Sequence, residues 1–247
     1  MIHFVGPCLF LLLTVGLIVP AAGGMEYERD VLPGSGGEVA VTFIGHGSLM
    51  LEYQGKVIHI DPYSRVADYA QLPKADIILL THHHQDHLDE TALNLIRTPA
   101  TEVVLTEKCA ERIDGGLVMD NGDERTVQNI SIAAVPAYNI VHRRGSGELF
   151  HPRGEGNGYV LSLGGIRIYI AGDTENTPEM KALRDIDYAF LPMNLPYTMT
   201  PEMAADAALA FRPRVLYPYH YGETDPNELT ALLKDAKDIK VRIRAMR

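Results

Sequence analysis

The sequence has few cysteines and a deficit of positive charge. Cys8 and Cys109 are its two cysteines, and they form no Cys-x-x-Cys pair for zinc or redox chemistry. A chain of 247 residues can bury a core that needs no disulfides. Lys and Arg number 22 against 32 Asp and Glu, giving a net charge of -10 without a long block of like charge. That balance argues against nucleic acid or an anionic membrane as the main partner.

Three catalytic motifs are also missing. The chain contains no G-x-S-x-G segment, no G-x-x-x-x-G-K-[ST] loop and no H-E-x-x-H helix motif. These absences argue against a serine hydrolase of the nucleophile-elbow type, a P-loop nucleotide enzyme and a metalloprotease built on a single helix.

Charged residues are lacking at the N-terminus as well. Residues 1–25 contain no Asp, Glu, Lys or Arg, and the apolar stretch Phe4–Val19 is followed by small residues up to Gly24. This pattern predicts an apolar leader over residues 1–24 and favours a signal peptide, which implies a secreted or periplasmic protein. Two alternatives stay open. The leader could remain as an uncleaved anchor in contact with the membrane, or translation could start at Met25 and give a cytoplasmic protein.

Beyond the leader, apolar alternation predicts several strands followed by strands mixed with helices. Asp89 is the expected N-cap of a helix that ends near Arg97. Strands are expected at 39–44, 49–53, 57–60, 76–80 and 215–217, with more short strands over 102–170, and helices at 178–183, 201–211 and 227–236. This order predicts one large layered α/β or α+β domain over residues 25–247.

Four of the ten histidines lie within residues 82–87, directly after a predicted buried strand. His82 and His84 are two residues apart, so in an extended segment they point the same way and can converge on one ion. As the chain turns into the next helix, Asp86 and His87 can reach a second ion. Imidazole and carboxylate ligands suit Zn²⁺, Mn²⁺ or Fe²⁺. The alternative, a solvated histidine-rich loop, leaves the strand-to-helix position unexplained.

Further ligands are expected at other strand ends, because one cluster cannot complete two metal sites. Asp173 follows the predicted strand 167–170 through Gly172, and His220 follows the strand at 215–217. A lone Asp or His in such a place is more often a turn residue. Together with the cluster, however, they supply a carboxylate to bridge two ions and one more imidazole.

These motifs carry a resemblance. The pattern T-H-x-H-x-D-H at Thr81–His87, followed by Ala171-Gly172-Asp173-Thr174 and Pro218-Tyr219-His220-Tyr221, resembles the metallo-β-lactamase superfamily. It is most similar to a compact single-domain branch that includes ascorbate-6-phosphate lactonase-like hydrolases. The resemblance covers about residues 37–222 and implies a four-layer αββα sandwich with a two-metal site at one edge.

The resemblance also implies a set of metal ligands. His82 and His84 would bind the first ion, Asp173 would bridge, and the second ion would be bound by Asp86, His87 and His220. Relatives often place another first-site histidine just after the strand that ends here at Tyr138, but this chain has Asn139 in that slot. His151 and His142 are the two candidates to replace it. We favour His151, because the segment His-Pro-Arg-Gly that it begins is typical of this branch.

Several other polar residues have weaker predicted roles. Asp61 and His46 follow strands near the expected site, where Asp61 can support a metal-bound histidine, with turn chemistry as the alternative for both. His83 is expected outside the metal shell. Asn139, Arg153 and the loop 195–199 are candidates for substrate contact.

The implied activity is metal-dependent hydrolysis of a small ester, lactone or phosphodiester by a hydroxide that bridges two divalent metal ions. Zn²⁺ is the favoured metal, with Mn²⁺ and Fe²⁺ as alternatives. Asp86 and Asp173 are the candidate catalytic residues, since either can orient the nucleophile or move its proton. Two other functions stay open: a non-catalytic metal-binding protein, and a di-iron oxidoreductase, although the chain has no flavin domain. A small-molecule substrate, and not nucleic acid, is the expected partner.

Overall fold

The computed structural model describes residues 19–20 and 26–247. The predicted leader over residues 1–24 lies outside this part of the chain, apart from β1 (Val19–Pro20), which pairs antiparallel with β2 (Glu26–Leu32). None of the helices in the described residues has the length and apolar character needed to cross a membrane.

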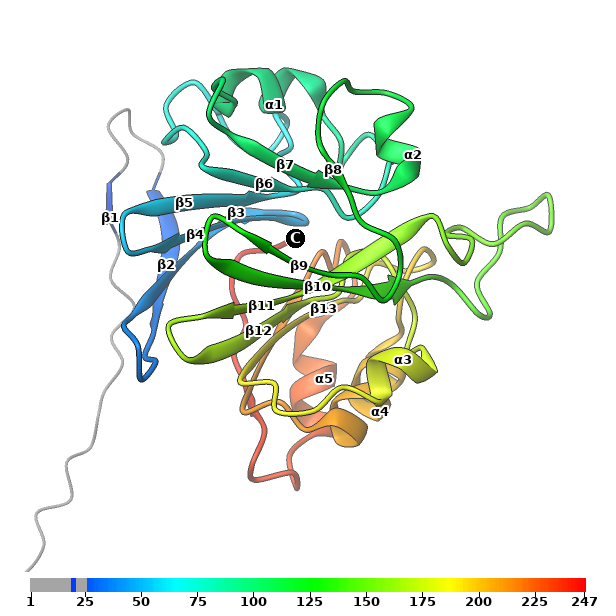
Figure 1. Cartoon of the computed structure of the whole chain (residues 1–247). Coiled ribbons are helices and arrows are strands. Elements are labelled where there is room, and N and C mark those ends of the chain that lie inside the picture. The colour runs from blue at the N-terminus through cyan, green and yellow to red at the C-terminus, as the bar shows by residue number, and fades with distance from the viewer. Residues whose placement is uncertain (1–18, 21–25) are drawn as a thin grey trace, which may run out of the picture.

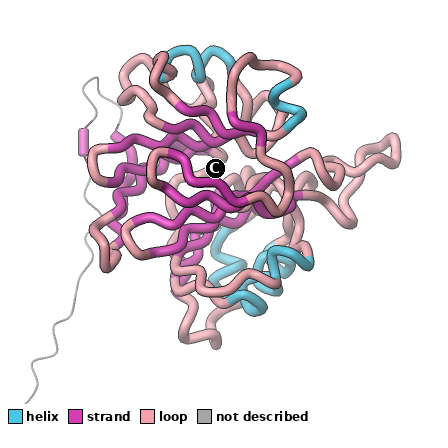
Figure 2. The backbone as a smooth tube through the Cα atoms, viewed as in Figure 1, coloured by secondary structure: helices cyan, strands magenta, loops and turns pink. Residues whose placement is uncertain are grey.

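Two β-sheets face each other, and helices cover their outer faces (Figures 1 and 2). The helices α1 (Glu90–Ile96) and α2 (Glu107–Ala110) lie against the first sheet. The second sheet is covered by α3 (Pro178–Lys181), α4 (Pro201–Phe211) and α5 (Pro226–Leu232). This is the expected four-layer αββα sandwich.

The first sheet has eight strands in sequence order. It is antiparallel from β1 to β5 and parallel from β5 to β8. Gln54 and Gly55 connect two strands with φ angles of 48° and 77°, which is the geometry of a tight hairpin turn. The remaining strands of this sheet are β3 (Val39–Gly45), β4 (Ser48–Tyr53), β5 (Lys56–Ile60), β6 (Ile77–Leu79), β7 (Glu102–Leu105) and β8 (Leu117–Val118).

The second sheet has seven strands in the order β15-β14-β13-β12-β11-β10-β9. It is antiparallel from β9 to β12 and parallel from β12 to β15. Its strands are β9 (Glu124–Val127), β10 (Ile130–Ala137), β11 (Gly156–Leu163), β12 (Ile166–Ile170), β13 (Tyr188–Pro192), β14 (Val215–Tyr219) and β15 (Lys240–Val241).

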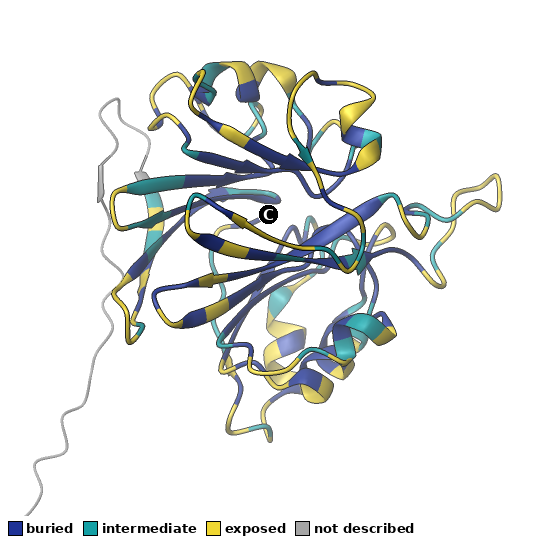
Figure 3. Cartoon of the chain, in the orientation of Figure 1, coloured by how far each residue is buried: buried dark blue, intermediate teal, exposed yellow. Residues whose placement is uncertain are grey.

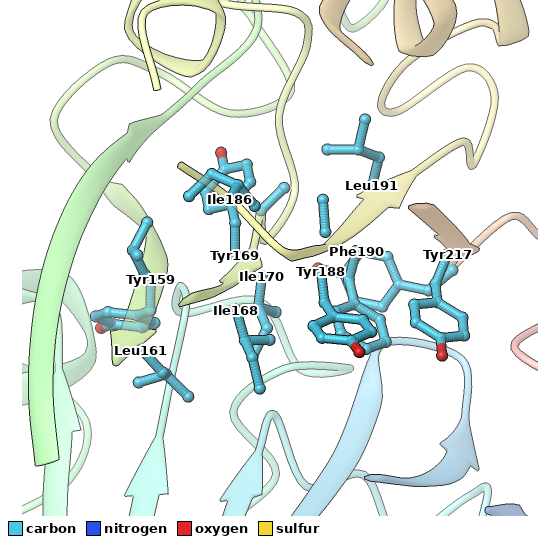
Figure 4. Close-up of a cluster of buried hydrophobic side chains, with 14 of the residues drawn as sticks. Tyr159, Leu161, Ile168, Tyr169, Ile170, Ile186, Tyr188, Phe190, Leu191 and Tyr217 are labelled. Atoms are coloured by element: carbon cyan, nitrogen blue, oxygen red, sulfur yellow. The ribbon is translucent and has the colours of Figure 1, made fainter. Parts of the chain in front are cut away.

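The main apolar core fills the space between the sheets, while exposed residues lie mainly on the loops, the outer faces of the helices and parts of the outer strands such as β9 (Figure 3). Phe190 and Tyr217 stack in it with ring centroids 4.9 Å apart, and Phe43 of the first sheet lies 5.3 Å from Tyr217 (Figure 4). A second cluster of buried residues packs the first sheet against α1. The two sheets are therefore joined by dense apolar packing.

Side-chain caps define the helix starts. Asp89 accepts hydrogen bonds from the backbone N–H groups of Thr91 and Ala92, as the sequence predicts for the N-cap of α1. The helix predicted at 227–236 is shorter and ends at Leu232. The residues after it form turns and bury little besides Leu233 and Ile239, so no apolar face supports further helical turns there.

The C-terminal segment is tied to the first sheet through one buried carboxylate. Asp30 of β2 accepts a hydrogen bond from the hydroxyl of Tyr217 at 2.6 Å, and it forms ion pairs with Arg242 at 3.2 Å and Arg244 at 2.8 Å. This network links residues more than 180 positions apart in the chain.

The topology also brings the predicted site residues to one edge of the sandwich. The strands β3, β5 and β6 of the first sheet run the same way, and so do β10, β12, β13 and β14 of the second. The residues that follow the carboxyl ends of these strands carry almost all of the predicted site residues.

Candidate metal centre

The histidine motif follows β6 and turns into α1. The carbonyl of His84 accepts hydrogen bonds from the backbone N–H of His87 at 3.0 Å and of Leu88 at 2.8 Å. This tight turn brings Asp86 and His87 back over the strand end, beside His82 and His84. The turn anticipated from the spacing is thus present.

One group of imidazoles lies around His82. The Nε2 atom of His82 is 3.1 Å from Nδ1 of His84. The ring of His151 lies 5.1 Å from that of His82 and 4.9 Å from that of His84, measured between centroids. Ligand atoms of these three histidines lie within 4.8 Å of one another. The structure therefore brings His151 to this group.

A second group lies on the other side of Asp173. The Nε2 atoms of His87 and His220 are 3.2 Å apart, and Oδ2 of Asp86 is 3.6 Å from each. Asp173 spans the two groups: its Oδ1 lies 3.5 Å from His87 Nε2 and 3.4 Å from His220 Nε2, and its Oδ2 lies 3.3 Å from His151 Nε2.

These separations match the spacing of ligands around a metal ion. Ligands about 2.0–2.1 Å from a tetrahedral cation lie roughly 3.3 Å from one another. Moreover, Oδ1 of Asp173 is buried and has no hydrogen-bond partner in the described residues, although two imidazole nitrogens face it. An unsatisfied carboxylate oxygen of this kind is costly unless a cation completes it. The residues present fit a metal.

His46 approaches the second group from the end of β3. Its Nε2 lies 2.9 Å from Asp86 Oδ2, and its ring centroid is 3.8 Å from that of His220. His46 thus contacts the proposed ligands directly. Its position after a strand leaves two alternatives open, a role beside the site and plain turn chemistry.

Asp61 supports the site from behind. It is fully buried, and its Oδ2 lies 2.8 Å from Nδ1 of His87 and accepts a hydrogen bond from the Thr81 hydroxyl at 2.6 Å. The Thr81 hydroxyl is in turn 3.1 Å from Nδ1 of His82. One carboxylate therefore fixes the orientation of two histidines, one in each group, as partners of metal ligands commonly do.

Asn139 has a different place from the one its position suggested. It is buried, and its Oδ1 lies 2.6 Å from Nδ1 of His151, so it orients that ring instead of lining the cavity. Its amide donates to the buried carboxylate of Glu175 at 3.0 Å. The same carboxylate lies 2.7 Å from Nδ1 of His142, which belongs to none of the groups of potential ligands found in the described residues. The backbone N–H of His142 also donates to Glu175, at 2.7 Å.

The charges of the site are strongly coupled. Burial opposes protonation of His87, but the carboxylates of Asp173 and Asp61 outweigh it and raise the pKa of His87 to about 10. Burial lowers the pKa of His84 to about 4, with nearby His151 adding to the shift. The neighbouring imidazoles overcome burial and hold the pKa of Asp173 well below its usual range. The lowered pKa values of His84 and Asp173 favour the neutral imidazole and the ionised carboxylate that bind metals, whereas His87 is protonated in the metal-free fold.

Three residues of the site have left-handed backbone conformations that are uncommon outside glycine. The φ angles are 55° at His46, 44° at Asp61 and 45° at His220. Gly172, just before Asp173, has a φ of 66°, and a Cβ atom there would lie 2.9 Å from both the Asn157 carbonyl oxygen and the Thr81 Cβ. Such backbone strain is often found where structure serves a site.

An open cavity of about 460 Å³ lies over the cluster. The residues that line it include Asp86, His151 and Asp173 of the cluster, and also Arg144 and Tyr197. Asp86 is reachable from this cavity, with a third of its side chain exposed, whereas Asp173 is almost fully covered.

Some predicted residues lie apart from the cluster. His83 belongs to none of the three groups of potential ligands found in the described residues, in agreement with its expected place outside the metal shell. Arg153 pairs with Glu179 at 2.6 Å and does not line the cavity. From the loop 195–199, Tyr197 does so.

Comparison with known proteins identifies the family of this chain. The family model of the beta-lactamase superfamily domain matches residues 40–220. The chain belongs to the metallo-β-lactamase superfamily. It is 30% identical over 221 residues to a UPF0173 metal-dependent hydrolase of Thermococcus kodakarensis, covering 82% of this chain and 96% of the relative. As a member of this superfamily, it is a metal-dependent hydrolase with histidine and aspartate clusters able to bind metal.

Two solved structures with similar sequences show the same fold. A protein of Parabacteroides distasonis, described as a candidate metal-dependent hydrolase, is 49% identical to this chain with a TM-score of 0.85. The match covers 90% of this chain and 100% of that one. Igni18, a metallo hydrolase from Ignicoccus hospitalis, is 27% identical with a TM-score of 0.69, covering 84% of this chain and 95% of that one.

Proposed function

We propose that this superfamily member is a binuclear hydrolase acting on a small ester, lactone or phosphodiester. One cation would be held by His82, His84 and His151, the other by Asp86, His87 and His220, and Asp173 would be shared between them. The observation that carries this proposal is the buried Asp173 carboxylate, which has imidazole nitrogens of both groups within 3.3 to 3.5 Å. The nitrogen-rich ligand set favours Zn²⁺, with Mn²⁺ and Fe²⁺ as alternatives.

Two bound divalent cations lower the pKa of a shared water, so that hydroxide is available near neutral pH. The chain's own residues divide the remaining work. Asp173 is almost fully covered and holds the two halves of the site together. Asp86 faces the cavity and can orient the attacking water and accept its proton. Asp61 and Asn139 act as positioning residues for His87 and His151.

Metal content and hydrolysis test this proposal together. Zn²⁺-, Mn²⁺- and Fe²⁺-loaded proteins are analysed for metal per chain and assayed on 4-nitrophenyl acetate, a γ-lactone and bis(4-nitrophenyl) phosphate. We expect two cations per chain and turnover of at least one substrate. The Asp86→Ala variant should lower kcat/KM by about 100-fold or more, and Asp173→Asn should lose at least one cation.

A matched control lies in the same motif. His83→Asn changes a histidine next to two proposed ligands and should keep both cations and full activity. A single cation per wild-type chain would contradict the binuclear centre. Two bound cations without turnover of any substrate would favour a non-catalytic metal-binding protein. Oxygen consumption by the iron-loaded form would favour a di-iron oxidoreductase. A His151→Asn variant that keeps two cations would remove His151 from the ligand set.

A further inference from the structure

The cavity is lined by one arginine, Arg144, that is not part of the proposed metal centre. Arg144 lies in the loop between β10 and β11, which projects from the body of the molecule in Figure 1. Its backbone N–H donates to the Glu148 carbonyl at 2.7 Å, and its guanidinium donates to the Phe150 carbonyl at 3.2 Å. The guanidinium carbon also lies 5.2 Å from the centroid of the Phe150 ring. These contacts hold the charge at the cavity.

The Arg144 guanidinium has no anionic partner. It forms no ion pair with any carboxylate in residues 26–247; its remaining polar neighbour is Nε2 of His84, at 3.4 Å. Arg143 donates to the Gly147 carbonyl and Arg153 pairs with Glu179, and neither lines the cavity.

The contact between Arg144 and His84 is weak and depends on the tautomer. His84 directs Nδ1 toward His82, so a cation in that group would be bound through Nδ1. The proton of a neutral imidazole then lies on Nε2, which can donate but cannot accept a hydrogen bond. In that form His84 does not satisfy the guanidinium of Arg144. The donors of Arg144 are then available to another acceptor in the cavity.

Two aromatic side chains, Phe150 and Tyr197, line the same cavity. The rings of Phe150 and Tyr197 meet edge to face with centroids 5.0 Å apart. Ile140, Val141 and Leu195 are large apolar residues that are exposed on the same two loops, and the Asn139 side chain ties these loops together by donating to the Tyr197 carbonyl. An exposed apolar group beside a cavity suits an apolar portion of a ligand.

We propose that Arg144 binds a negatively charged oxygen group of the substrate, a carboxylate or a phosphate, carried on an apolar segment that packs against Phe150 and Tyr197. The fork of a guanidinium matches two oxygens of such a group. This inference rests on the proposed hydrolase function and narrows its substrates to anionic esters, lactones or phosphodiesters, with the bond to be cleaved over the histidine and aspartate cluster.

Binding of simple acids tests the inference without requiring turnover. Adipate and 5-phosphonopentanoate each carry a second anionic group, whereas pentanoate has the same apolar chain and a single carboxylate. Their dissociation constants are measured by calorimetry on Zn²⁺-loaded wild-type protein and on two variants, Arg144→Gln and Arg143→Gln. Both variants remove one positive charge from adjacent positions, but only position 144 lines the cavity.

We expect wild-type protein to prefer a doubly anionic ligand over pentanoate, and Arg144→Gln to reduce that preference about 10- to 100-fold. Arg143→Gln should leave the preference unchanged. A stronger effect on adipate identifies the group as a carboxylate, and a stronger effect on 5-phosphonopentanoate identifies a phosphate. The inference is wrong if wild-type protein shows no preference, if Arg144→Gln retains it, or if Arg143→Gln reduces it equally. Lack of turnover on every ester would contradict the proposed hydrolase, but these binding ratios would still decide the role of Arg144.

Discussion

Replacing Asp61 with asparagine is expected to weaken both halves of the proposed metal centre. When His87 binds through Nε2, its Nδ1–H donates to Oδ2 of Asp61. When His82 binds through Nε2, its Nδ1–H donates to the Thr81 hydroxyl, whose own proton goes to the same Asp61 oxygen. Asparagine places an NH₂ group there or, if turned over, against the backbone N–H of Thr81. In either orientation a donor faces a donor in a buried site.

The magnitude follows from that mismatch. One unsatisfied buried donor costs about 1–3 kcal/mol, which corresponds to a change of about 5- to 150-fold in an equilibrium constant. Loss of the partner of a metal-bound imidazole typically weakens metal binding by about 10- to 100-fold. Because Asp61 serves His87 directly and His82 through Thr81, we expect the dissociation constants of both cations to rise by about 10- to 100-fold.

Competition for Zn²⁺ with a chromophoric chelator measures the two dissociation constants, and circular dichroism checks the fold. Asp76→Asn is the matched control. Its carboxylate accepts a hydrogen bond from the backbone N–H of Val57 at 2.8 Å, just before β6 and outside the cluster, and an asparagine oxygen can do the same. If Asp61→Asn bound both cations within about threefold of wild type, the proposed chain of hydrogen bonds would be wrong. If only one of the two cations bound more weakly, Thr81 would not belong to this chain of hydrogen bonds.

Three further predictions concern pH, stability and thiol reactivity. Because the pKa of His87 rises from 6.5 in the unfolded chain to about 10 in the metal-free fold, its stabilising effect is complete below pH 6.5 and is lost as the pH rises through 10. Thermal unfolding of metal-free protein should therefore occur at lower temperature as the pH increases over that range, and Zn²⁺-loaded protein should not show this loss. Asp30→Asn leaves two arginines without their buried carboxylate and should lower the free energy of unfolding by about 3 kcal/mol in urea titrations; an unchanged value would refute this. Burial raises the pKa of the Cys109 thiol to about 11, so in a Cys8→Ser background a disulfide reagent at pH 8 should label it only after unfolding. Rapid labelling of the native protein would contradict that burial.

Local patterns in the sequence were sufficient to predict most of the fold. The alternation at residues 39–60 and the turn at Gln54–Gly55 predict an antiparallel hairpin, because side-chain period and turn chemistry act within a few residues. Asp89 predicts the start of α1 for the same reason. The end of α5 was not predictable at this level, since it depends on whether a tertiary surface is available to bury the next turn.

The residues of the candidate site also differ in whether local sequence patterns could place them. Residues close in sequence, such as His82 and His87, could be placed from spacing and a single turn. Asn139 could not, because its role depends on His151, which is twelve residues away across a loop. The signal was that an amide stands at the position where the family resemblance implies a histidine. Asn139 instead orients His151, the proposed ligand that lies farther along the same loop.

The left-handed residues explain why strand ends alone did not define the site. At His46, Asp61 and His220 the backbone leaves its strand with positive φ, at a cost of about 1–3 kcal/mol for each strained position. Histidine adopts this conformation more often than most residues, but it is still uncommon there. Neighbouring contacts therefore maintain it, such as the hydrogen bond from the His220 backbone N–H to the His46 carbonyl at 3.0 Å. Two strand ends from opposite sheets thereby hold each other in place. The contacts that strain the backbone would also preorganise the proposed ligands for a bound cation. The dense core between the sheets supplies the stability that offsets the strain.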